Sequence, residues 1–138
     1  MKGSGAQIAV AAIFAGVGPP LAGAGVTLAM LAPAIVEMPE VAFMAVFGLL
    51  FGYIIGLPAA LITGVAAAWL SPRMANGWLW LLASTAIGGA AAGVMAPFIQ
   101  FGGGKLSTLE QVTLMGGSGA FAALVCGLIC LRLRPRPA

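Results

Sequence analysis

Four long apolar stretches, almost free of charge, constrain this chain more than any other feature. They cover residues 6–36, 41–70, 77–100 and 108–133. A helix needs about 20 predominantly apolar residues to cross the hydrocarbon core of a bilayer, and every stretch is at least that long. Only 7% of the 138 residues are charged, whereas a soluble domain carries about 25% charged residues. The sequence therefore predicts an all-α integral membrane protein, with residues 1–138 forming a single four-helix transmembrane domain.

The connections between the stretches are short and carry signals that end or begin helices. Short links make sequential helices antiparallel neighbours. Pro72 disfavours a helical conformation for Ser71, so the second helix is expected to end there. Ser107 and Glu110 have the spacing of a capping box, which predicts the start of the fourth helix. The connections are residues 37–40, 71–76 and 101–107.

The distribution of charge predicts the orientation in the membrane. One side, with both chain ends and the second connection, carries five basic residues and no acid. The other side carries three acids and one lysine. Basic residues concentrate on the cytoplasmic side, so we expect an N-in, C-in protein in the inner membrane of a bacterium. The first group is Lys2, Arg73, Arg132, Arg134 and Arg136, and the second is Glu37, Glu40, Glu110 and Lys105.

Three tryptophans agree with this orientation. Trp69, Trp78 and Trp80 flank the second connection, and tryptophans gather in belts at the membrane–water interfaces. We therefore expect all three to belong to the belt at the cytoplasmic surface.

Small residues recur at every fourth position of the second stretch, and the third and fourth stretches carry shorter sets. Lipid gives helices no hydrophobic reason to associate, so close packing of small faces supplies the attraction. We interpret most of these faces as contacts inside the bundle, and a surplus face as the contact of a homo-oligomer or a larger membrane complex. The sets are Gly48, Gly52, Gly56, Ala60, Gly64 and Ala68, then Thr85, Gly89 and Gly93, then Gly119, Ala123 and Gly127.

Glycine and proline stand in the first two stretches at matched depth. Gly18, Pro19 and Pro20 lie in the first stretch, and Gly56 and Pro58 lie in the second. At a rise of about 1.5 Å per residue, both groups fall near the bilayer midplane. Proline frees a backbone carbonyl and bends a helix, which predicts that both helices are kinked or interrupted. Paired breaks also mark midplane binding sites in transporters, so a site here is the alternative to a simple kink.

Few polar side chains lie deep in the stretches. Thr63 and Thr85 lie at similar depth, and we expect them to hydrogen-bond across the second and third helices. Tyr53 lies close to the midplane, where its hydroxyl needs a partner. The bare carbonyls near Gly16 or Gly52 are the expected acceptors. Together with Thr27, Ser84 and Ser118, these side chains are candidates for lining a path for a neutral solute or water.

The sequence offers no constellation for catalysis, a cofactor or a metal ion. It has no histidine, and its acids lie in or beside the connections on the outer side, where no base stands ready to activate a serine or threonine within a stretch. Cys126 and Cys130 lie one helical turn apart without further ligands, which favours packing over a metal or redox pair. A net charge of +3 without a basic stripe argues against nucleic acid. We expect no enzyme activity, no cofactor, and lipid as the surroundings.

Three functions remain. The first is a non-catalytic accessory or structural subunit that packs through small-residue helix faces. The second is a small oligomeric channel or transporter for a neutral solute or an ion, built around the midplane glycines and prolines. It ranks lower because no acid or base, which usually couples transport, lies deep within a stretch. The third is a holin-like pore former, which short hydrophobic helices and a basic tail suit.

Overall fold

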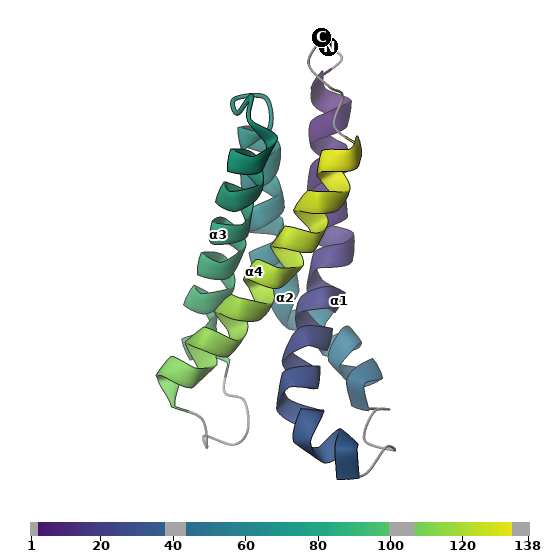
Figure 1. Ribbon diagram of the computed structural model, residues 1–138, viewed down its shortest axis with the longest axis vertical. Helices are drawn as coiled ribbons and strands as arrows, with labels where there is room; N and C mark the ends of the chain where they lie inside the picture. Colours follow the sequence, from purple (N-terminus) through teal and green to yellow (C-terminus); the bar gives the residue numbers. More distant parts are fainter. Residues whose placement is uncertain (1–2, 38–43, 100–106, 134–138) are drawn as a thin grey trace.

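Four long helices form the part of the chain that the structure describes. This computed structural model describes residues 3–37, 44–99 and 107–133 (Figure 1). Each long helix is apolar and long enough to cross a membrane, as the sequence predicted. The elements are α1 (Gly3–Glu37), α2 (Met44–Leu70), α3 (Gly77–Met95), the short 3-10 helix η2 (Ala96–Phe98) and α4 (Thr108–Leu133).

Successive helices run antiparallel and pair as two hairpins, α1–α2 and α3–α4 (Figure 1). Contacts are most extensive within each hairpin, and weaker contacts of α1 with α4 and of α2 with α3 join the two. All four helices lie together at the end of the bundle where α1 begins and α4 ends, and the hairpins diverge toward the opposite end (Figure 1). We call these the closed end and the open end.

Local signals set the helix boundaries. The Ser107 hydroxyl accepts a bond from the backbone N–H of Glu110 (3.3 Å), and the Glu110 carboxylate accepts one from the N–H of Ser107 (2.8 Å). This reciprocal pair confirms the predicted capping box. The third helix ends earlier than its apolar stretch, because Pro97 lacks an N–H and the chain tightens into η2. Asn76, which the sequence patterns did not single out, caps α3 by accepting from the N–H of Trp78 (3.0 Å).

The two helices with central prolines are continuous. α1 runs through Pro19 and Pro20, and α2 runs through Pro58. The helices are therefore not interrupted at these positions, and a kink there stays a prediction. Several residues used above lie outside the described residues: 41–43 at the start of the second stretch, and Lys2, Glu40, Lys105, Arg134 and Arg136.

α1 and α2 approach until their backbones touch. A Cβ atom placed on Gly52 would lie 2.5 Å from the carbonyl oxygen of Pro19 and 2.8 Å from Cα of Gly23, well inside normal contact. The glycines of the second stretch thus face α1 of the same chain, and several of these positions have no room for a larger side chain. Along the contact Gly48 meets Thr27, Gly52 meets Gly23, Gly56 meets Pro19, and Gly64 meets Ala11.

The second hairpin uses the same kind of contact. A Cβ atom on Gly88 would lie 3.0 Å from the carbonyl oxygen of Gly119, and one on Gly89 would lie 3.2 Å from the carbonyl oxygen of Gly116. A Cβ atom on Gly93 would be 3.6 Å from the side chain of Val112, which is ordinary contact. All six glycines assigned to helix packing, in both hairpins, therefore face another helix of this chain.

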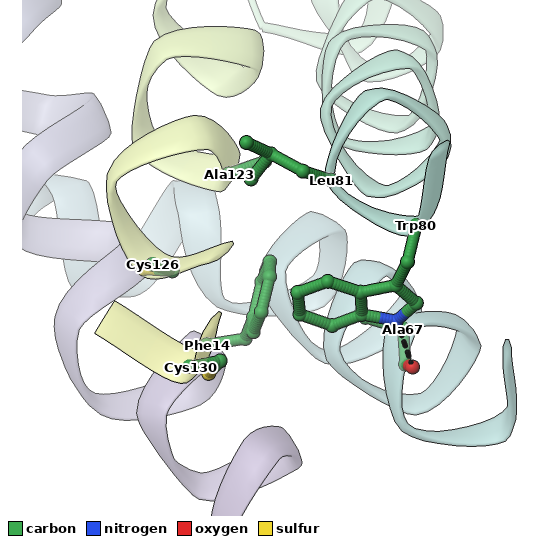
Figure 2. Packing of buried hydrophobic residues seen from close by; sticks show 7 residues of the cluster. All are labelled: Phe14, Ala67, Trp80, Leu81, Ala123, Cys126 and Cys130. Atoms are coloured by element: carbon green, nitrogen blue, oxygen red, sulfur yellow. Dashed lines mark hydrogen bonds between the residues drawn. The ribbon is translucent and has the colours of Figure 1, made fainter. Parts of the chain in front are cut away.

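Aromatic side chains fill the closed end (Figure 2). Phe14 of α1 and Trp80 of α3 are buried against each other, beside Leu81 and Ala123. The indole N–H of Trp80 donates to the carbonyl of Ala67 (2.8 Å), which ties α3 to α2. The cysteines of α4 belong to the same cluster as free, buried side chains, in agreement with the packing interpretation.

The position of Trp80 corrects one expectation. Trp69 and Trp78 are 57% and 68% exposed, as members of an aromatic belt would be, but Trp80 is 1% exposed. Two positions along a helix correspond to a rotation of about 200°, so Trp78 and Trp80 face opposite directions. Trp80 is therefore a core residue, and its assignment to the belt was wrong.

We expect Gly52→Ala to destabilise the bundle by about 1–3 kcal/mol, the usual cost of forcing extra atoms into a packed interior. SDS-driven unfolding of the purified protein, followed by circular dichroism, measures the effect. Gly117→Ala is the matched control on α4, because a Cβ atom there would meet nothing within 4 Å in the part of the chain that the structure describes. Equal stability of the two variants would contradict the close α1–α2 contact.

Candidate functional site

A cavity of about 100 Å³ lies between the two hairpins. All four helices line it, from the middle of the bundle toward the open end. Phe14 belongs both to the lining and to the aromatic cluster, so it forms the floor at the closed end. The walls include Gly18 and Ala22 of α1, Ile55 and Ala59 of α2, Ala92 of α3 and Ala122 of α4.

Three hydroxyl groups in the lining are all satisfied within their own helices. Thr27 donates to the carbonyl of the residue four positions earlier (2.8 Å), and Thr63 does the same (2.7 Å). Ser118 donates to the carbonyl three positions earlier (2.9 Å). Such local bonds leave these side chains without need of a partner inside the cavity. The walls therefore present mainly apolar groups.

The midplane residues predicted from the sequence separate into two groups. Gly18 and Gly56 line the cavity, and Pro19 is buried beside them against α2. Pro20 is not part of the lining, and Pro58 is exposed on the outside of α2. The glycines at this depth therefore line the cavity, whereas none of the three prolines belongs to its lining.

Tyr53 bonds to a carbonyl that proline leaves free. Its hydroxyl donates to the carbonyl oxygen of Gly16 on α1. Pro20 stands four residues after Gly16 and has no N–H, so the helix itself cannot supply the donor. This confirms the expectation of a carbonyl acceptor near Gly16. Tyr53 links α1 to α2 and is not part of the cavity lining.

The expected bond between two threonines is not formed. Thr63 donates to the carbonyl of Ala59, and Thr85 donates to that of Leu81 (2.9 Å). The prediction was wrong because a threonine hydroxyl in a helix can donate to the carbonyl one turn earlier in the same helix. This bond does not require a neighbouring helix to lie at a particular position. Neither hydroxyl joins α2 to α3.

Several lining residues were not anticipated. Gly88, Ala92 and Met95 of α3 and Met115 of α4 face the cavity. The sequence holds a partial signal for two of them. Gly88 and Ala92 are four positions apart, and each directly precedes a member of the small-residue set of the third stretch, Gly89 and Gly93. Such spacing predicts a helix face that packs closely against another helix. It does not show where two helices are far enough apart to leave a cavity between them.

Within the described residues, no group of three or more His, Cys, Asp or Glu side chains is placed to hold a metal ion. The serine and threonine hydroxyls in the cavity are engaged with backbone carbonyls. Comparisons of the chain with protein-family models, with curated proteins and with solved structures find no match. The cavity and the outer helix faces are thus the features from which a function can be inferred.

We expect Tyr53→Phe to lower stability by about 1 kcal/mol, within the range measured for hydrogen bonds between membrane helices. Pro20→Ala provides the internal control, because it restores a backbone N–H that can reach Gly16. In that background Tyr53→Phe should cost less, as determined by SDS unfolding of all four proteins. The same cost in both backgrounds would show that the tyrosine does not serve the proline-freed carbonyl.

Proposed function

We propose that the protein is a non-catalytic membrane subunit that binds another transmembrane helix through an uncovered small-residue face of α1. The face consists of Gly5, Ala9, Ala12 and Gly16. All four are exposed, and a Cβ atom on Gly5 or Gly16 would meet none of the other described residues within 4 Å. This uncovered face is the single observation that carries the proposal.

The four residues form one narrow line along the helix. Their spacings of four, three and four positions keep them within about 60° of each other at 100° per residue. Larger side chains border the line, with Ile8 on one flank and Val17 on the other. Small residues between larger ones form a groove along the helix, which is the shape that admits a second helix closely.

The other small-residue faces do not provide such a contact. The glycines of α2 lie against α1, and those of α3 lie against α4. Those glycines therefore form the contacts within the hairpins, whereas no described helix of this chain covers the line on α1. In lipid, an uncovered groove lacks the van der Waals contacts that a closely packed partner helix would make with it. This contrast supports a role in a larger complex.

The channel or transporter hypothesis has one observation in its favour, the cavity between the hairpins. Two features of the described residues count against a polar path through it. The hydroxyls of the lining bond to their own helices, and Phe14 and Trp80 fill the closed end. We therefore place this function second.

We expect Ala12→Leu to release the partner helix, because a leucine would fill the groove and hold the two backbones apart. The measurement is gentle extraction of the tagged protein from its native membrane, followed by native mass spectrometry. Recovery of the partner, whether a foreign chain or a second copy, should fall by about tenfold, which corresponds to about 1.4 kcal/mol.

Ala86→Leu is the matched control, because Ala86 is exposed on α3, away from the proposed face. It should retain the partner as the wild type does. A monomeric wild-type protein, or an Ala12→Leu variant that retains its partner in full, would refute the proposal.

A further inference from the structure

The cavity between the hairpins has the volume of one small molecule. It measures about 100 Å³, which is somewhat less than the roughly 150 Å³ of an apolar cavity, engineered into a soluble protein, that binds benzene or xenon. The space therefore has room for a compact guest of that kind. A longer hydrocarbon chain or the side of another helix would not fit into this volume.

The hydroxyl groups of the lining are too far apart to hold a water molecule between them. Gly48, which meets Thr27, lies 15 positions before Thr63 on α2, a distance of about 20 Å along the helix. Ser118 lies near Gly25, at the same end as Thr27. A buried water typically makes about three hydrogen bonds, and each of these hydroxyls already donates to its own helix.

The rest of the lining favours an apolar guest. Glycine, alanine, isoleucine, methionine and phenylalanine form most of it, and no charged side chain is among the described residues that line it. Atoms that face an empty space lose dispersion contacts on that side, and apolar cavities take up apolar molecules. Small apolar solutes transfer favourably from water into hydrocarbon, so a bilayer around four such helices holds them close to this cavity.

We infer that this cavity is a binding site for one small apolar molecule no larger than benzene, a class that includes dissolved gases and the shortest hydrocarbons. The inference goes beyond the proposed subunit function, since it concerns a different surface. The uncovered face of α1 points away from the bundle, whereas the guest lies between the hairpins. The glycine contacts within each hairpin hold the walls in place on both sides of it.

Two methionine methyl groups provide the test. Met95 of α3 and Met115 of α4 line the cavity, whereas Met30 of α1 is 39% exposed and does not line it. The full-length protein, with ¹³C-labelled methionine methyl groups, is studied by NMR in nanodiscs under increasing xenon pressure. We expect the shifts of Met95 and Met115 to saturate as one site fills, and that of Met30 to change linearly as xenon dissolves in the lipid. Linear changes at all three would overturn the inference.

A second arm tests the size and the polarity of the guest. Benzene should compete with xenon and reduce the xenon-induced shift of Met115, whereas biphenyl, which carries a second ring, should leave it unchanged. Biphenyl that competes as well as benzene would overturn the assignment to a small molecule. A persistent nuclear Overhauser effect between water and the Met115 methyl group would show a hydrated cavity, and would equally overturn the inference.

A variant with a filled cavity provides the third arm. Ala22→Leu should weaken xenon binding, measured at Met115, by at least about tenfold, because the added side chain takes up the free volume. Ala29→Leu is the matched control, because Ala29 is exposed on the same helix and does not line the cavity. Unchanged saturation in Ala22→Leu would contradict the site. Loss of partner binding in Ala12→Leu bears only on the proposed subunit function.

Discussion

The backbone contact between α1 and α2 is the interaction on which the rest of the structure depends. At Gly23 and Gly52 no side chain separates the two helices, and the nearest atoms across the contact are backbone atoms of Pro19, Gly23, Gly48 and Gly52. In a bilayer such close packing is the main source of attraction between helices, because lipid tails compete with any apolar side chain. The close contact ties α1 to α2 as one hairpin, and the equivalent glycines tie α3 to α4.

The shape of the space between the hairpins follows from these two contacts. The closed end brings all four helices together around Phe14 and Trp80, with the indole N–H bonded to α2. Beyond that cluster each helix stays with its hairpin partner, and the hairpins separate (Figure 1). A cavity lined by small residues is the result, since the residues that pack a hairpin tightly cannot also reach across to the other one. The cavity therefore follows from the positions of the glycines that pack α1 against α2 and α3 against α4.

Much of the fold could be predicted from the sequence because lengths and local signals are properties of single segments. Apolar runs, the Ser107–Glu110 capping box and the small-residue spacing each predicted what the structure has. The errors concern helix rotation, which no single segment determines. Trp80 was placed outside the bundle and lies inside it. The cavity lining was predicted only in part, through Gly18, Gly56 and the hydroxyl residues Thr27, Thr63 and Ser118, because a space between helices depends on how two hairpins cross.

The hydrogen bond at Gly16 explains how the exposed face of α1 can be stable without a partner helix. A carbonyl freed by proline has no donor in its own helix, and hydrocarbon offers none, so leaving it unsatisfied would be unfavourable. The Tyr53 hydroxyl from α2 satisfies it, so the face needs no polar group from outside. A partner helix would then have only packing to contribute. Under the proposed function, binding to such a face would be governed by the fit of the two helix surfaces, so one added leucine is expected to prevent it.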